Sequence, residues 1–250
     1  EVNKYPCLRE DALNKNIVNA SESSGKLAKA LKNLTLWGTI VATVGLSFAI
    51  VITALIFSFR DWGEEQFNLL IGLKNLFLVL ILVVFSFIFR FSCQKIHALK
   101  EGYTAEFKIW WAGLLIALVV AVISNGKIPL VLVGVVATSL MVRQRLGEFR
   151  YGYSHFQNAL ISLWGILGNL LAAIVFAIGL YFFPENFFFG KGLELNLIMA
   201  FCSLLPVPYL EGLQIYFGSY KLYLVTILIV FLVAALLVTQ TTAGLIIAIV

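Results

Sequence analysis

The segment LLIGLKNLFLVLILVVFSFIFRF, residues 69–91, is a nearly continuous apolar run. It is long enough to cross the hydrocarbon core of a bilayer, which needs about 20 residues in a helix. The whole chain has the same character, because 61% of its 250 residues are hydrophobic and only 12% are charged, with a mean hydropathy of +0.96. Soluble domains are about half apolar and about a quarter charged. The sequence therefore predicts an all-α polytopic membrane protein.

Other apolar runs surround this one and predict about six to eight membrane-spanning segments in total. Two neighbouring runs are short, and they are either a pair of short spans or a re-entrant hairpin around the linker SNGK at 124–127. The final run ends with the sequence, which predicts a truncated last helix. The remaining apolar runs lie at 36–59, 109–123, 128–142, 156–183, 195–217, 222–238 and 243–250.

The distribution of basic residues predicts the orientation of these segments. With the N-terminus inside, the inner segments carry 13 lysines and arginines and the outer segments carry three. Basic residues collect in the loops that stay on the cytoplasmic side, so we expect a multi-pass protein of the cell membrane with a cytoplasmic N-terminus. The net charge of +5 is explained in this way, without a nucleic-acid partner. A basic stripe before the first span is a topology signal or a contact with anionic membrane lipids; it consists of Lys26, Lys29 and Lys32.

A second segment, SLLPVPYLEG at 203–212, interrupts an apolar run with two prolines and an acid. Pro206 and Pro208 each remove a backbone donor and free a carbonyl. Such a break is tolerated at membrane depth only where protein or a water-filled cavity covers it. Glu211 follows the break, and an acid within a membrane segment usually faces a partner in the bundle interior. The alternative is a helix end that reaches the headgroups early, with Glu211 among them.

The segment SLLPVPYLEG resembles the signature N-L-L-P-V-P-P-L-D-G of the site-2 proteases, which are intramembrane zinc metalloproteases. ISLWGILGNLLAAIVFA at 161–177 is similar to that family's A-L-A-G-P-L-A-N-L-L-L-A segment, with Gly165 and Asn169 in register. ALKEGYTAEFKIWWAGLLIALV at 98–119 resembles the stretch that follows the zinc motif in archaeal members. The resemblance implies four parts: a polar cytoplasmic segment, a first helix with its outer loop, a site-2 protease-like core and C-terminal helices. Their boundaries are 1–35, 36–68, 69–217 and 218–250.

The resemblance also implies that the catalytic motif of the family is degenerate here. The family's H-E-x-x-H aligns with RFSCQ, that is Arg90, Phe91, Ser92, Cys93 and Gln94, and its aspartate ligand aligns with Glu211. An arginine cannot bind zinc and a phenylalanine cannot act as a base. We therefore expect no bound metal or other cofactor and no protease activity. The alternative is an active enzyme with an unusual zinc site formed by His97, His155 and Glu211.

In the fold that the resemblance implies, residues 90 and 211 both face the former metal centre. We hypothesise that the Arg90 guanidinium replaces the ion and pairs with the Glu211 carboxylate, because either charge alone is costly in a low dielectric. We expect Gln94 to satisfy the donors of the guanidinium that Glu211 leaves free. In the competing arrangement Arg90 extends to the headgroups and Glu211 is protonated.

A protease fold without its chemistry predicts a binding function. Site-2 proteases hold a transmembrane segment of their substrate, so we expect a pseudoprotease that binds transmembrane helices of other integral membrane proteins, or an accessory subunit of a membrane complex. The resemblance implies that Asn169 contacts the bound segment as an extended strand. The other residues that we expect at this binding site are Gly165, Pro206, Pro208 and Gly212. Transport is disfavoured, because no second broken helix appears at a matching position of an inverted repeat.

Overall fold

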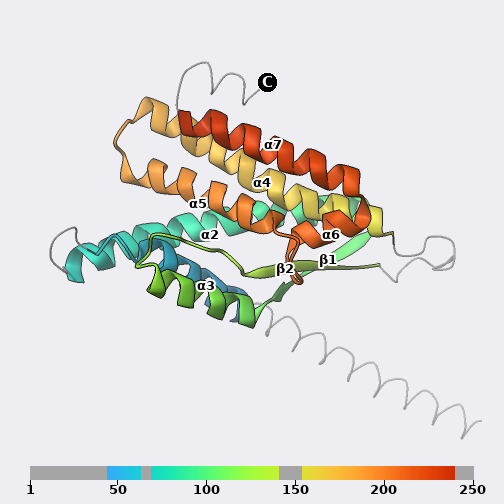
Figure 1. The fold of residues 1–250 in the computed structure, drawn as a ribbon, viewed down its shortest axis with the longest axis horizontal. Helices are drawn as coiled ribbons and strands as arrows, with labels where there is room; N and C mark the ends of the chain where they lie inside the picture. Colours follow the sequence, from blue (N-terminus) through green and yellow to red (C-terminus); the bar gives the residue numbers. More distant parts are fainter. Residues whose placement is uncertain (1–43, 63–68, 141–153, 240–250) are drawn as a thin grey trace, which may run out of the picture. The chain divides into compact units, whose positions relative to one another are not determined.

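The fold comes from a computed structural model that describes residues 44–62, 69–140 and 154–239. Within these residues the chain is mostly helical, with one small sheet (Figure 1). The elements, in chain order, are the helix Val44–Ser58, α2 (Leu69–Lys100), β1 (Tyr103–Ile109), α3 (Trp111–Ile123), β2 (Gly134–Leu140), α4 (His155–Phe182), α5 (Phe187–Leu204), α6 (Glu211–Gly218) and α7 (Tyr220–Thr239).

Four helices of the described residues are long and apolar enough to cross a membrane, namely α2, α4, α5 and α7. This number is lower than the six to eight spans predicted from the sequence. Helix α3 has 13 residues, and at 1.5 Å per residue it is about 20 Å long, too short for a core of about 30 Å. The predicted first span, 36–59, is described only from residue 44, and the run 243–250 and the segment 1–35 lie outside the described residues.

The segment 128–140 does not form the short span that was one of the two arrangements expected here, and the mostly helical fold includes one two-stranded sheet. The second half of this segment is the strand β2, which pairs antiparallel with β1 in a register that sets Tyr103 opposite Leu140 and Ile109 opposite Gly134. The segment is rich in valine, which favours strands, and periodicity does not separate a short apolar strand from a buried helix. Gly134 has φ +149°, a conformation that other residues rarely adopt. Of the two arrangements open for this region, the chain adopts a hairpin excursion rather than two spans.

This excursion leaves the sheet after Ile109 and returns to it at Gly134. Helix α3 forms the outward half, and residues 128–133 return without regular structure. At the point of return the backbone N–H of Trp110 donates to the carbonyl of Val133 at 2.9 Å. Helix α3 lies beside the helix Val44–Ser58 (Figure 1), with which it shares a buried apolar cluster.

Helix α4 lies in the middle of the bundle and contacts α2, α5, α6 and α7. Its buried face contains small residues that permit close helix packing: Gly165, Gly168, Ala172 and Ala173. The loop that follows α4 is shorter than the interval between the predicted runs 156–183 and 195–217, because α5 begins at Phe187. The side chain of Asn186 caps this helix by accepting from the backbone N–H of Phe188 at 3.0 Å.

The predicted proline break separates α5 from α6. Helix α5 ends at Leu204, and α6 begins at Glu211. Between them Pro206 and Pro208 are exposed, and Tyr209 has φ +67°. Gly212 allows the close approach of the two helix ends, because a Cβ atom there would lie 2.7 Å from the carbonyl oxygen of Leu205. The break therefore places the first turn of α6 directly against the end of α5.

Candidate functional site

The candidate site is a buried ion pair between α2 and α6. Arg90 donates from Nη2 to Oε2 of Glu211, and Gln94 donates from Nε2 to Oε1 of the same carboxylate at 3.1 Å. Arg90 and Gln94 are four residues apart and so lie on one face of α2. The side chains of Arg90 and Glu211 are 7% and 1% exposed. The structure thus brings together the three residues that the resemblance led us to expect at one site, and both carboxylate oxygens accept a hydrogen bond.

The helix break sets the position of Glu211. As the first residue of α6 it lies in the turn where the backbone N–H groups are free and the helix dipole favours a negative charge. Leu210, the residue before the helix, makes no capping hydrogen bond with its side chain. The carboxylate therefore has favourable electrostatics from its own helix as well as from Arg90.

Helix α4 holds α2 at the distance that the site requires. A Cβ atom on Gly165 would lie 2.6 Å from Cδ of Gln94, and one on Gly168 would lie 3.3 Å from Cα of Arg90. Both values are tighter than an ordinary contact of about 4 Å between carbon atoms. The two glycines thus fix the close packing of α4 against the helix that carries Arg90.

The buried guanidinium shows that Arg90 does not extend to a membrane surface. Two buried charges lose their hydration, and only a close, hydrogen-bonded partner offsets that loss. Here the partner is Glu211, so the arrangement in which Arg90 reaches the headgroups is not the one observed. The pair joins α2 to the α5–α6 break, two segments separated by 121 residues in sequence.

A small cavity of about 10 Å³ adjoins the pair. Its volume is that of about one water molecule, so it does not accept a peptide. Phe91 lines it and packs against Phe87 and Phe107, with ring centroids 5.7 and 4.9 Å away. Phe91, which the resemblance would place at the position of a catalytic glutamate, is thus part of an aromatic cluster.

The remaining predicted site residues are divided between the interior and the surface. Asn169 is fully buried, and its amide atoms have no hydrogen-bond partner among the described residues. Gly165 and Gly212 are also buried, whereas Pro206 and Pro208 are exposed at the break. The predicted binding residues therefore do not form one continuous surface.

The two histidines lie apart from each other in the described structure. His97 packs against Trp164 with ring centroids 5.4 Å apart, and His155 begins α4. Among residues 44–62, 69–140 and 154–239 no three His, Cys, Asp or Glu side chains come together as a set of metal ligands. The alternative zinc set of His97, His155 and Glu211 is therefore not assembled in this part of the chain.

The sequence did not predict the hydrogen bonds that attach the strands β1 and β2 to α4. Tyr103 donates from its hydroxyl to Oε1 of Gln157 at 2.6 Å, and Thr138 donates to Oδ1 of Asn158 at 2.7 Å. The polar pair Gln157–Asn158 at the start of an apolar helix was the available signal. These bonds fix both strands to α4.

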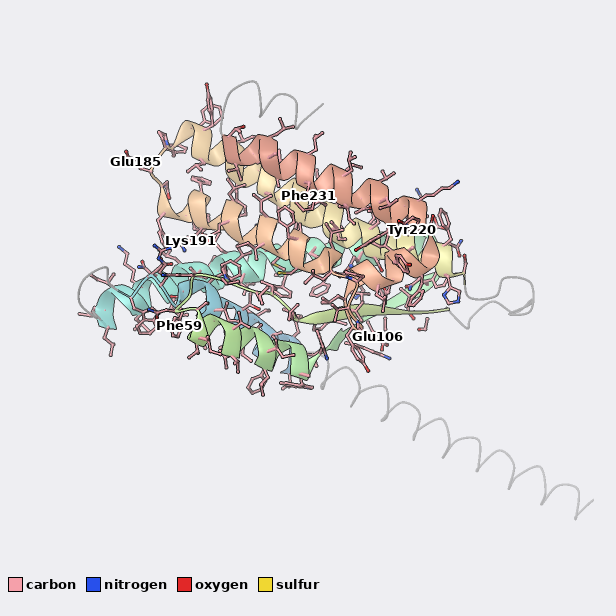
Figure 2. The ribbon with its side chains drawn as sticks, viewed as in Figure 1. Phe59, Glu106, Glu185, Lys191, Tyr220 and Phe231 are labelled. Carbon is pink, nitrogen blue, oxygen red and sulfur yellow. The ribbon has the colours of Figure 1, made fainter. Side chains whose placement is uncertain are left out.

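A second group of charged side chains lies around Lys191. Figure 2 shows Lys191 and Phe59 near one end and Glu106 and Tyr220 near the other. Lys191 lies between Asp61 and Glu194, at 3.1 and 3.4 Å. This second, partly exposed ion pair is separate from the buried pair.

Comparison of the chain with protein-family models, curated protein sequences and solved structures found no match. The functional argument therefore depends on the residues of the site.

Proposed function

We propose that this chain is a membrane pseudoprotease with a degenerate site-2 protease-like centre, which binds a segment of a partner membrane protein and does not cleave it. The observation that supports the proposal best is the state of the Glu211 carboxylate. Both of its oxygens accept hydrogen bonds from residues of α2, namely Arg90 and Gln94. In the proposed relationship this carboxylate corresponds to a zinc ligand.

The chemistry at these positions favours a structural role. Hydrolysis in the related family requires a zinc ion held by two imidazoles and a carboxylate, with a glutamate to take the proton of the bound water. Here the corresponding side chains are a guanidinium, an aromatic ring and an amide. Arg90 supplies the positive charge that a metal ion would supply, so that α2 remains joined to α6.

The small sheet supplies a means of binding. In the described part of the chain the sheet has only two strands, so each strand has one edge that pairs with no third strand. An extended segment can bind such an edge by backbone hydrogen bonds. Glu106 and Lys108 are exposed on β1. We propose that the partner segment unwinds locally and pairs with the free edge of β1.

Photo-crosslinking in native membranes tests the binding function. A benzophenone amino acid at Glu106 or Lys108 is expected to give an adduct with one membrane protein, identified by mass spectrometry. The matched control is Leu228, which is 65% exposed on α7, and lipid should be its main adduct. Lipid adducts alone at all three positions would contradict a bound protein segment.

Restoring the zinc motif tests the proposed relationship. The variant Arg90→His/Phe91→Glu/Gln94→His supplies two imidazoles one helical turn apart, which together with Glu211 can hold zinc in a three-ligand site. We expect one zinc per chain by metal analysis of the purified variant. A folded variant without zinc would show that the proposed alignment is wrong. Stoichiometric zinc in the unmodified protein would support the alternative, an active protease with an unusual ligand set.

A further inference from the structure

A column of polar side chains runs along the common interior of α2, α4 and α5. On α2 it consists of three buried residues at a spacing of four, which is one face of a helix: Ser86, Arg90 and Gln94. Asn169 on α4 and Asn196 on α5 are both fully buried. All three helices are long and apolar enough to span a membrane, so this column lies where bulk water is excluded.

The packing of the three helices determines the level of each residue, that is, its position along the axis of the bundle. Gln94 lies against Gly165, and the rings of Phe85 and Phe176 are 5.9 Å apart. Since α2 and α4 run in opposite directions, these contacts place Asn169 near the level of Arg90.

A similar comparison gives the level of Asn196 along the bundle. Phe176 lies against Gly192 of α5, and four residues further along α5 is Asn196. Its level along α4 is therefore that of Ala172, which by the same reasoning is the level of Ser86. The column thus extends from the ion pair by about one helical turn, or about 5 Å, toward the other end of the bundle.

Many polar atoms of the column lack partners. Within the part of the chain that the structure describes, no hydrogen bond is made by Nε of Arg90, Oε1 of Gln94, Oγ of Ser86, Oδ1 of Asn196 or either amide atom of Asn169. A polar group that is buried without a partner destabilises the folded protein. Polar residues within membrane segments usually face a partner or a water-filled cavity. The number of these atoms in one place indicates a common ligand.

We propose that this column binds a short chain of water molecules between α2, α4 and α5. The ligand is neutral, because Arg90 is the only charged residue of the column and is already paired with Glu211. It must both donate and accept, because the free atoms include donors and acceptors. The cavity of about 10 Å³, which has room for about one water molecule, touches the column at Arg90 alone; its other walls come from Phe87 and Phe91 of α2, from the sheet region and from the α5–α6 break. Opposite Ser86, α4 presents only the small side chains of Ala172 and Ala173. This inference does not depend on the proposed function.

Radiolytic hydroxyl-radical labelling of the purified full-length chain in detergent tests the proposal, because radicals formed from bound water oxidise adjacent side chains. Met199 is the reporter: it is fully buried, and the helix register places it near the level of Asn169. Met199 belongs to one buried apolar cluster, and the control variant Leu170→Met places a second thioether in a different buried apolar cluster, on α4, where the native leucine is 4% exposed. We expect rapid oxidation of Met199 and none of the introduced methionine.

Two further variants connect the labelling to the column. Asn169→Leu and Asn196→Leu should each abolish oxidation of Met199, and thermal unfolding of the same samples shows whether they are folded. Because one of the two variants could fail to fold, either of them suffices. The proposal is overturned if Met199 is not oxidised, if the introduced methionine is oxidised equally, or if oxidation persists in a folded leucine variant.

Discussion

Removing one partner of the buried ion pair should destabilise the protein strongly. In Arg90→Met the Glu211 carboxylate keeps only the donor of Gln94, at 3.1 Å. Breaking a buried pair in this way costs about 3–5 kcal/mol. Glu211→Gln leaves the guanidinium without an anion and should cost a similar amount. The double variant Arg90→Met/Glu211→Gln removes both charges, and it should unfold within about 1 kcal/mol of the native protein, because well-packed neutral replacements of buried pairs are often neutral or stabilising.

Unfolding free energies of the four proteins, measured in one detergent at pH 7, form a double-mutant cycle. We expect a coupling energy of at least about 3 kcal/mol. Lys191→Met is the matched control. It removes a cation whose side chain is 19% exposed between two carboxylates, and such pairs contribute about 0–1 kcal/mol. Additive effects of Arg90→Met and Glu211→Gln, or losses no larger than that of the control, would refute the reasoning.

Two further predictions concern helix packing and the hairpin. Gly165→Ala should lower the unfolding free energy by about 1–3 kcal/mol, because the new Cβ overlaps the amide of Gln94; Gly190→Ala, with open space at its Cβ position, should instead stabilise α5 by up to about 1 kcal/mol. Equal effects of the two alanines in thermal unfolding would contradict the packing. Tyr103→Phe removes the hydroxyl that bonds Gln157 at 2.6 Å and should cost about 1 kcal/mol, measured in the same assay. An unchanged stability would show that this bond does not hold the hairpin.

The features that were predicted correctly from the sequence are those for which any other arrangement would cost a large free energy. The spans of α2, α4 and α7 follow from long apolar runs, and the break before α6 follows from Pro206 and Pro208, because the loss of backbone donors is independent of tertiary context. The proximity of Arg90 and Glu211 was expected from the resemblance, and the charges of the two residues supported that expectation. Each is too costly to bury singly, so the chain had few arrangements available for the two charges.

The hairpin could not be predicted in the same way. Residues 128–142 are as apolar as a helix that spans the membrane, and the choice between strand and helix depends on β1, which follows α2 far from this segment. Extended backbone in an apolar setting must have partners for its polar groups. Val131 donates its N–H to the thiol of Cys202 at 3.4 Å, and the carbonyl of Val133 accepts from Trp110. Neither partner can be recognised before the helices are placed.

The neutral polar residues show why charge was the more informative signal. A serine or asparagine in a spanning helix costs too little to require a particular partner, so Ser86 and Asn196 carry no information when each is read alone. Only the packing of α2 against α4 and α5 brings them to one level. Their role follows from the number of unpaired groups that meet there, and that number is a property of the assembled bundle. The ion pair was therefore accessible from the sequence, and the polar column beside it was not.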